Sequence, residues 1–214
     1  MGANSDPLTY DAWYRTRRGS WIGDREFDLL MRMTRPHAGA SCLDVGSGTG
    51  YFSRRFAKAG LSVTALDRQE NMLAYARLQS GGGVYVCGDA QTLPFADQSF
   101  DYCMAVTSLC FVADPAQAVR EMLRVARYAV VIGLLNRQSL LYHQKQGRGG
   151  YEGARWDHPE TVRGWLAGRG FGEKIRVRTA VFVPGGGYVG RLVEHCLPIR
   201  LPWGGFLAVS FSRQ

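Results

Sequence analysis

The sequence contains few lysines and no closely paired cysteines. Only three of its 26 basic residues are Lys, and the other 23 are Arg. The five cysteines form no CxxC motif and leave an odd one, so neither a disulfide framework nor a zinc ribbon is expected. Three of them lie within apolar runs, where a free thiol packs as a small hydrophobic group. We therefore expect reduced cysteines and no metal site.

Long apolar runs are also missing. The longest, AVVIGLL at 129–135, is far too short to span a bilayer. The first ten residues, MGANSDPLTY, show no charged segment followed by an apolar one and so do not form a secretory signal. Asp6 stands where an N-myristoylation pattern requires Ser or Thr. These absences predict a cytoplasmic protein that does not insert into a membrane.

The remaining composition is that of a globular protein, and the net charge is unevenly distributed. With 214 residues, 46% of them hydrophobic and 21% charged, one domain is expected. The formal net charge is +8, but residues 1–136 carry 14 basic and 13 acidic side chains, whereas residues 137–214 carry 12 and 5. The excess either attracts an anionic partner or forms a solvated Arg-rich surface, and the sequence leaves both open.

Short apolar runs alternate with longer amphipathic ones. We predict strands at 40–45, 61–66, 83–87, 100–106 and 128–135, and helices at 51–59, 70–79 and 115–127. Asp114-Pro115 supplies a helix cap and a first-turn proline. A helical region is predicted at 8–34, another helix near 159–169, and strands within 174–183 and 206–212. This alternation is typical of a parallel sheet with helices on both faces.

The most informative motif is LDVGSGTGYF, residues 43–52. Its glycines allow a tight turn that a ligand can approach closely. Tyr51 stands where the dinucleotide pattern GxGxxG needs glycine. Asp67 ends the second predicted strand and Asp89 follows the third, so both acids lie near the glycine turn. The set favours a nucleoside without a pyrophosphate, although either Asp44 or Asp67 alone is explained equally well as a helix cap.

Four segments together resemble the class I S-adenosylmethionine-dependent methyltransferases, in particular the small-molecule branch with the ubiquinone and menaquinone enzymes. They are LDVGSGTGYF, TALDRQENMLAYAR, GDAQTLPFADQSFD and VTSLCFVADPAQAVREMLRV. The resemblance implies an α/β, Rossmann-like, seven-stranded, mostly parallel sheet with helices on both faces and a reversed last strand. It also implies one methyltransferase domain over 1–214, with lid helices at 1–35, a cofactor-binding core at 36–136 and an acceptor-side region at 137–214.

The resemblance further implies that S-adenosylmethionine is the cofactor and S-adenosylhomocysteine the product. The glycine turn would hold the methionine part and the sugar of the cofactor, and Asp67 would bind the ribose. The residues that follow the second and third predicted strands would contact the adenine. Tyr10 and Tyr14 would close over the cofactor. The implied cofactor residues are Tyr14, Asp44, Gly46, Ser47, Gly48, Gly50, Asp67, Arg68, Met72, Asp89, Ala90 and Thr107.

The methyl acceptor is expected in the C-terminal third. Arginines with aromatic side chains suit an acidic or aromatic small molecule, and a small thiol also fits. The candidate substrate residues are Tyr10, Asn136, Tyr142, Tyr151, Arg155 and Trp156. At least one of Tyr142, Trp156 and Trp165 is expected to belong to the core instead.

A general base is needed only if the attacking atom keeps its proton at neutral pH. His143 and His158 are the candidates, with Tyr151 and His195 as further options, and each His is more simply explained by a surface or packing role. Two departures from relatives bear on the acceptor: no Pro-Gly-Gly turn precedes the fifth strand, and Cys110-Phe111 replaces a His pair.

Other functions remain open at this point. The basic C-terminal third permits an RNA or protein methyltransferase, although no appended RNA-binding fold is visible, so nucleic acid is not the expected partner. A nicotinamide dehydrogenase is opposed by the GxGxG spacing. A non-catalytic sensor or assembly subunit that binds the cofactor fits the same motifs. We expect a monomer or a homodimer.

Overall fold

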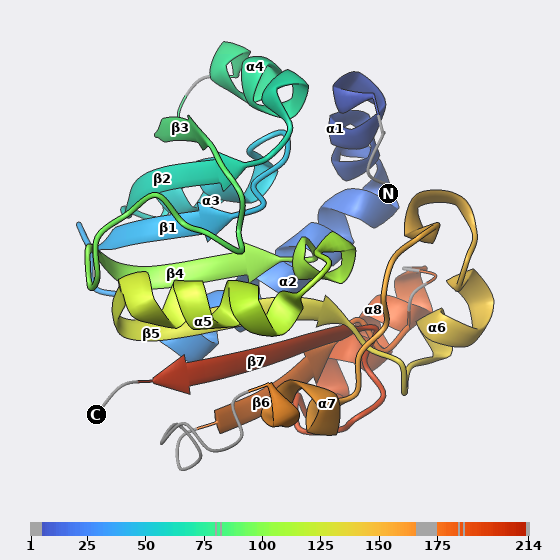
Figure 1. Ribbon diagram of the computed structural model, residues 1–214. Coiled ribbons are helices and arrows are strands. Elements are labelled where there is room, and N and C mark those ends of the chain that lie inside the picture. The colour runs from blue at the N-terminus through green and yellow to red at the C-terminus, as the bar shows by residue number, and fades with distance from the viewer. Residues whose placement is uncertain are drawn as a thin grey trace.

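The computed structural model describes residues 6–79, 81, 83–165, 175–183, 185 and 187–212 (Figure 1). The strands are β1 (Ser41–Val45), β2 (Ser62–Asp67), β3 (Val84–Cys87), β4 (Phe100–Val106), β5 (Ala126–Leu135), β6 (Ile175–Ala180) and β7 (Phe206–Ser212). The helices are α1 (Pro7–Arg15), α2 (Arg17–Thr34), α3 (Tyr51–Lys58), α4 (Glu70–Leu78), α5 (Pro115–Val125), α6 (Leu140–Lys145), α7 (Pro159–Gly164) and α8 (Tyr188–Cys196), with short 3-10 helices η1 (Leu109–Phe111) and η2 (Gly149–Tyr151).

The seven strands form one sheet in the order β3-β2-β1-β4-β5-β7-β6. Strands β1 to β5 pair in parallel, whereas β7 runs antiparallel to both β5 and β6. This confirms the predicted α/β, Rossmann-like fold with a reversed last strand. In the described part of the chain, no helix is long and apolar enough to cross a membrane.

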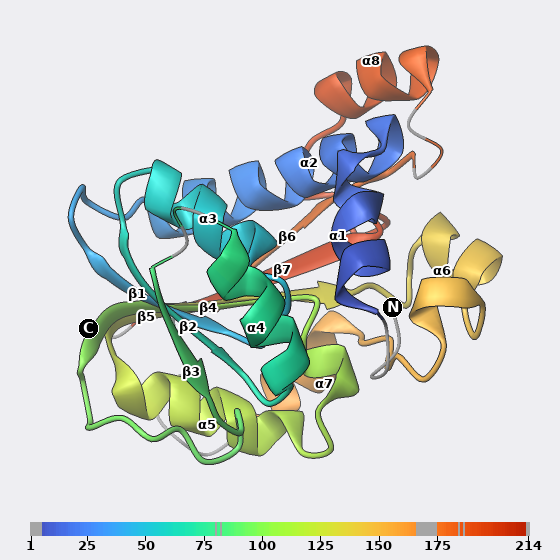
Figure 2. The same ribbon diagram turned by 90° about the horizontal axis from the view of Figure 1, so that it is seen from above.

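Helices cover both faces of the sheet (Figure 2). On one face, α5 and α7 pack over the central strands through a cluster that includes Met122, Val130 and Val162. On the other, α2 and α3 bury Leu30 and Phe56 against β1, β4 and β7. Helices α1 and α6 lie beyond the carboxyl ends of the parallel strands (Figures 1 and 2), which is the edge at which open α/β sheets bind ligands.

The predicted helical region 8–34 is two helices. Thr16 adopts an extended backbone (φ −69°, ψ 152°), its hydroxyl donates to Trp13 O at 2.7 Å, and the same oxygen accepts from Gly19 N at 3.0 Å. Thr16 thus ends α1 and caps α2. Only α1 lies over the sheet edge, because the apolar side of α2 is part of the core. The described part of the predicted lid thus consists of α1 over the sheet edge and α2, whose apolar side packs in the core; residues 1–5 lie outside the described residues.

The segment from α5 to β5 explains the missing Pro-Gly-Gly turn. Helix α5 begins as predicted, with Pro115 in its first turn and the Asp114 carboxylate accepting from Gln117 N at 2.9 Å. It ends at Val125, and β5 begins at the next residue, so no turn residues are needed. The predicted helix 159–169 is observed as α7, and its residues from 166 onward lie outside the described residues.

Candidate active site

The glycine turn after β1 is built from three residues with left-handed backbone angles. Gly46, Gly48 and Gly50 have φ values of 72°, 54° and 74°. A Cβ on Gly46 would lie 2.3 Å from Ser108 Cβ, and one on Gly50 would lie 2.9 Å from the Tyr85 hydroxyl, so both positions are sterically closed. A Cβ on Gly48 would meet only Tyr10 Cε1, at 3.9 Å. The turn therefore presents one open position, and it faces Tyr10.

Two hydroxyls of this turn are buried without a partner. Ser47 Oγ and Thr49 Oγ1 make no hydrogen bond within the described residues. Burying a hydroxyl without a partner is unfavourable, so such groups are expected where a ligand supplies the missing contact. The open side of Gly48 and these hydroxyls fit a polar ligand lying on the turn, as the expected cofactor requires.

Asp67 joins the end of β2 to the glycine turn. Its carboxylate accepts from Gly48 N at 2.8 Å and from Gln69 N at 2.9 Å. Burial raises the pKa of this carboxyl, while its backbone hydrogen bonds oppose the rise. Each carboxylate oxygen keeps a further lone pair, so Asp67 has acceptors left for two ligand hydroxyls. The structure thus brings Asp67 and Gly48 together, 19 residues apart in sequence.

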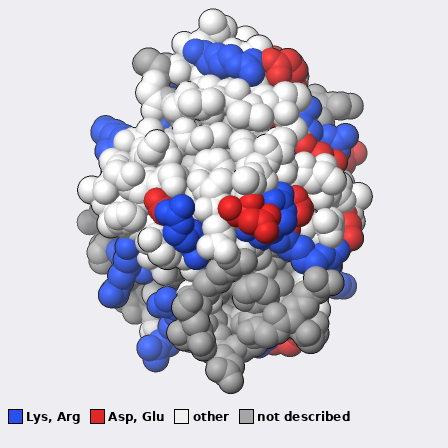
Figure 3. All heavy atoms as spheres, turned by 60° about the vertical axis from the view of Figure 1, so that its left-hand side comes forward, with Lys and Arg blue, Asp and Glu red and all other residues white. Residues whose placement is uncertain are grey.

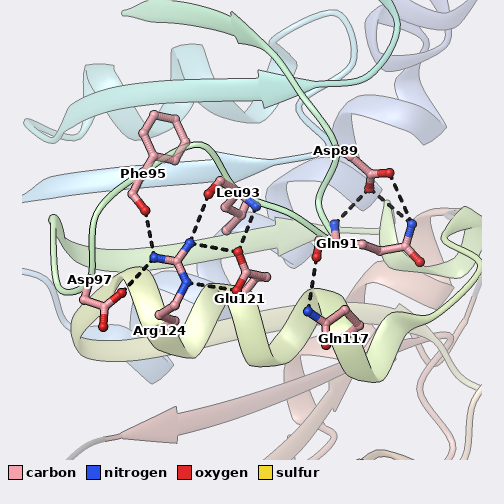
Figure 4. A network of polar contacts seen from close by, with 8 residues as sticks. All are labelled: Asp89, Gln91, Leu93, Phe95, Asp97, Gln117, Glu121 and Arg124. Atoms are coloured by element: carbon pink, nitrogen blue, oxygen red, sulfur yellow. Dashed lines mark hydrogen bonds and ion pairs between the residues drawn. The ribbon is translucent and has the colours of Figure 1, made fainter.

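Asp89 follows β3 and is exposed. Its carboxylate accepts from Gln91 N at 2.8 Å and contacts Gln91 Nε2. Figure 4 shows how the following loop is fixed to α5: Arg124 donates to the carbonyls of Leu93 and Phe95 and pairs with Glu121. Leu93 N in turn donates to the Glu121 carboxylate at 2.9 Å. This network explains why an irregular loop holds a defined position beside the sheet edge.

Four other predicted cofactor residues differ in their accessibility. Arg68 is exposed, Ala90 is partly buried, and Met72 is 5% exposed on α4. Thr107 follows β4 with a positive φ of 49° and lines the large cavity described below. The first three lie on the segments after β2 and β3, near Asp67 and Asp89, so the topology places them around one end of the glycine turn.

Asp44 lies inside the protein. It is 1% exposed, and its carboxylate accepts a hydrogen bond from the Ser53 hydroxyl on α3. Burial raises its pKa to about 7. We do not retain Asp44 as a cofactor contact, because its side chain ties β1 to the helix that follows the glycine turn.

A cavity of about 810 Å³ opens beside the glycine turn, between α1, α2 and the segment from α6 to η2. Its floor comes from the strand ends, with Thr107, Leu135 and Phe206 among the lining residues. Tyr10 and Tyr14 line one side and Tyr151 the other. The volume suits a small organic ligand.

Of the predicted substrate residues, Tyr10 and Tyr151 line this cavity and the other four are not among its lining. Asn136 is fully buried, and its amide donates to Pro202 O at 2.6 Å and Gly204 O at 2.7 Å. Arg155 pairs with Asp157 at 2.9 Å and donates to Leu109 O at 3.0 Å. Neither Asn136 nor Arg155 is retained as a substrate contact, because these bonds hold the strand ends and loops together.

Tyr142 and Trp156 pack behind the cavity wall. Their ring centroids are 5.4 Å apart, Trp156 also lies 5.5 Å from the Tyr151 ring, and Trp156 is 8% exposed. Trp156 thus belongs to a small apolar cluster, as expected for at least one of these aromatic residues. The packing of Tyr142 and Trp156 therefore supports the Tyr151 ring at the cavity wall.

Of the predicted bases, Tyr151 lines the cavity, whereas His143 and His158 lie elsewhere. His143 is exposed on α6, and His158 precedes α7; neither is among the residues lining the cavity. The side chain of His195 lies outside the described residues. Cys110 does line the cavity, but burial raises its pKa to about 12, which opposes a thiolate role. Within the described chain, no group of three or more metal-ligating side chains is found.

Sequence reasoning missed Glu26, whose side chain lines the cavity from α2 and is 7% exposed. The signal was available: the buried face of α2 consists of Gly19, Ile22, Gly23, Glu26, Leu29, Leu30 and Met33. One acid within an otherwise apolar stripe is unusual, because burying a carboxylate is costly. Burial raises the pKa of Glu26 to about 8, and the charge of Arg55 partly offsets this.

The burial of Glu26 predicts that the stability of the protein falls as pH rises. Its pKa is 4.5 when unperturbed and about 8 in the fold, so between these values the folded state binds more protons than the unfolded state. The free energy of unfolding therefore decreases with pH across this window, by on the order of a few kcal/mol. Thermal unfolding at pH 5, 7 and 9 of the wild type and Glu26→Gln measures the effect.

The glutamine variant is expected to gain stability relative to the wild type as pH rises. Asp44 has a raised pKa as well, but it is present in both proteins and cancels in the difference. A difference in melting temperature that stays constant from pH 5 to pH 9 would show that Glu26 does not titrate in this way.

Comparison with known proteins adds three findings. Residues 43–130 match a family model described as a methyltransferase domain. The malonyl-(acyl-carrier protein) O-methyltransferase of Pectobacterium atrosepticum is 38% identical over 123 residues, which is 58% of this chain and 46% of that protein. The demethylmenaquinone methyltransferase of Renibacterium salmoninarum is 43% identical over 89 residues, covering 42% of this chain and 38% of that protein.

A solved structure from Thermotoga maritima extends the similarity over the whole fold. It is described as an S-adenosylmethionine-dependent methyltransferase, possibly a histamine N-methyltransferase, and it superposes with a TM-score of 0.74 at 24% identity over 97% of this chain and 96% of that one. At this identity, the likeness concerns the fold. The chain spans less than half the length of the two curated relatives.

Proposed function

We propose that this chain, whose residues 43–130 form a methyltransferase domain of the S-adenosylmethionine-dependent family, transfers a methyl group from S-adenosylmethionine to a small molecule in the adjoining cavity. One observation carries the proposal: Tyr10 faces the open position of the glycine turn and also lines the cavity of about 810 Å³. A nucleoside site and an acceptor site thus share one side chain.

The residues proposed to hold the cofactor are those that the structure gathers at the glycine turn. Ser47 and Thr49 offer unpartnered hydroxyls, Gly48 leaves space, and Asp67 offers carboxylate lone pairs for ribose hydroxyls. Asp89 stands at the end of β3, where the adenine edge is expected. When bound, S-adenosylmethionine supplies a sulfonium methyl group whose transfer breaks the carbon–sulfur bond and leaves S-adenosylhomocysteine.

The contribution of the chain is alignment and the exclusion of water. Tyr10 and Tyr14 on α1 form one wall with ring centroids 5.8 Å apart, and Tyr14 stacks on Tyr51 at 3.8 Å. These packed rings fix α1 over the sheet edge. An acceptor lying between this wall and Tyr151 is held by rings on two sides, with little room for water.

The acceptor is not carried over from the curated relatives, because malonyl-(acyl-carrier protein) and demethylmenaquinone differ in chemistry. The match to the family model also ends at residue 130, before the C-terminal third. A small acceptor is favoured over a polynucleotide by the size and aromatic lining of the cavity. On the face shown in Figure 3, acidic side chains also lie beside basic ones and no unbroken basic surface is seen. We also propose a cytoplasmic location and a monomer or homodimer.

The test combines titration with product detection. Isothermal titration is expected to show micromolar or tighter binding of S-adenosylhomocysteine and no binding of NADH. Incubation with methyl-labelled S-adenosylmethionine and a cell extract, separated into small-molecule, RNA and protein fractions, is expected to label the small-molecule fraction. Labelled RNA or protein would favour the corresponding macromolecular methyltransferase, and cofactor binding with no labelled product would favour a sensor.

A further inference from the structure

Glu26 is a buried carboxylate that faces a cavity and has no hydrogen-bond partner in the described part of the chain. Among the described residues, no donor reaches its oxygens, although its side chain is 7% exposed and lines the acceptor cavity. Buried carboxylates in folded proteins are normally paired or hydrogen-bonded. An unpaired one aimed into a cavity therefore indicates a ligand that brings its own proton donors.

We propose that Glu26 binds the amino group of the methyl acceptor, and that the acceptor is a small amine with an aromatic or apolar body. This inference rests on the proposed function and names the substrate class of the same site. An ammonium group supplies both of the things that Glu26 lacks, a positive charge and hydrogen-bond donors.

The groups around Glu26 leave the carboxylate available. Arg55 on α3 is the cation that acts on it, but the Arg55 guanidinium is already bonded to Asp24 at 2.6 Å and to the Tyr51 hydroxyl at 2.9 Å. It also lies over the Phe27 ring, 4.6 Å from its centroid. Arg55 thus lowers the cost of burying Glu26 without occupying its oxygens.

The other titratable groups facing this part of the cavity are tyrosines. Tyr10 and Tyr14 come from α1, Tyr51 from α3 and Tyr151 from η2, and the charge of Glu26 acts on all four. Burial raises the pKa of Tyr10 and of Tyr151 to about 12, so their rings are neutral at physiological pH. Neutral electron-rich rings attract cations through their faces, which adds to the preference for an amine.

Basic residues also line the cavity, and they raise the opposite possibility of an anionic acceptor. Lys145 and Arg18 are partly exposed and Arg148 is fully exposed, so water and salt screen their charges. Glu26 is buried, where the dielectric is lower and a charge acts more strongly. Above its pKa of about 8, ionised Glu26 would repel a carboxylate acceptor more than the exposed cations attract it, and below that pH the neutral carboxyl group would give an anion no attraction, which favours the amine.

Glu26 also suits the proton that an amine must lose. An ammonium nitrogen has no free lone pair until one N–H bond breaks; the proton then moves to a Glu26 oxygen and the electron pair stays on nitrogen. A carboxyl with a pKa of about 8 is well matched to this transfer near neutral pH.

Binding of matched probes tests the inference without turnover. At pH 8.5, where Glu26 is largely ionised, we expect 2-phenylethylamine to bind the wild type, in titrations with and without S-adenosylhomocysteine, at least tenfold more tightly than 3-phenylpropanoate. Glu26→Gln should lose at least tenfold in amine affinity and gain affinity for the acid. Asp28→Asn is the matched control, since it removes the same charge from the same helix outside this cavity.

The pH dependence separates a charge contact from a packing effect. Below the Glu26 pKa of about 8, binding of the amine must displace a proton from Glu26. The affinity of the wild type for the amine should therefore fall by up to about tenfold for each unit by which the pH is lowered. The amine affinity of the wild type should be independent of pH between the pKa of Glu26 and the pKa of the amine. In Glu26→Gln it should be independent of pH over both ranges. Glu26→Asp, which keeps the charge, should retain part of the slope.

Three results would overturn the inference: no binding of the amine, tighter binding of the acid, or equal amine affinity in wild type and Glu26→Gln. Unchanged S-adenosylhomocysteine binding by the glutamine variant shows that it is folded. The two proposals fail separately, because loss of S-adenosylhomocysteine binding in the wild type contradicts the proposed function. A wild type that binds S-adenosylhomocysteine but prefers the acid contradicts only the role of Glu26.

Discussion

Gly48→Val is expected to reduce the affinity for S-adenosylhomocysteine at least about a thousandfold, equivalent to about 4 kcal/mol. The open position on the glycine turn is where a side chain at residue 48 would project, and its nearest neighbour there is Tyr10 at 3.9 Å. A valine would fill the space proposed for the ligand. It would also strain the backbone, because Gly48 has a φ of 54°.

A valine substitution at a second glycine distinguishes backbone strain from blocking of the ligand site. Gly60 has a φ of 91° and nothing within 4 Å of an added Cβ, and it lies in the turn between α3 and β2. Gly60→Val is therefore expected to lower the melting temperature to a similar degree while leaving cofactor affinity unchanged. Isothermal titration of both variants, with melting curves, decides the matter. Binding by Gly48→Val within tenfold of the wild type would mean that the ligand does not lie on the turn.

Asp67→Ala is expected to weaken binding of S-adenosylhomocysteine by about a hundredfold or more. Hydrogen bonds to a charged group contribute about 1.5–3 kcal/mol each, and the carboxylate has acceptors for two ribose hydroxyls. The structure adds a second reason for a large loss. Asp67 also accepts from Gly48 N at 2.8 Å, so alanine would release the glycine turn from the end of β2.

A double-mutant cycle in which the ligand is one partner distinguishes these two contributions. The wild type should bind adenosine more tightly than 2′,3′-dideoxyadenosine, and Asp67→Ala should bind both equally if Asp67 contacts the ribose hydroxyls. If the variant keeps the same preference for adenosine, Asp67 acts only through the turn. Asp28→Ala, which removes a half-buried carboxylate of α2 that does not line the cavity, should leave both affinities unchanged.

The cofactor half of the site was predictable because its signals are local in sequence. Left-handed backbone angles at the turn require glycine, so Gly46, Gly48 and Gly50 appear as a pattern that any reader of the sequence can find. Asp67 is the last residue of a short apolar strand, and parallel strands end at one edge of a sheet. Its contact with Gly48 follows from that topology.

Four of the six residues predicted for the substrate half do not line the cavity, because cavity-lining residues share no local sequence pattern. Asn136 and Arg155 stand in polar, aromatic-rich segments that suggested ligand contact, yet the backbone carbonyls of distant loops occupy their donors. Glu26 lies on the mostly apolar, buried face of α2, a pattern that by itself indicates packing in the core. Its role depends on α2 lying against the cavity, and the sequence pattern of one helix does not give that placement.

The sequence by itself determined the seven strands and the helices α3, α4, α5 and α7, the glycine turn and the acids at the strand ends, since each depends on neighbours within a few residues. It did not give α6, α8 or the division of the first helical region. The tertiary structure alone decided which side chains face the cavity between α1, α2 and the α6–η2 segment. The physical reason is that burial and hydrogen-bond satisfaction depend on groups far apart in the chain. They leave Glu26 without a partner and fully occupy the side chain of Asn136.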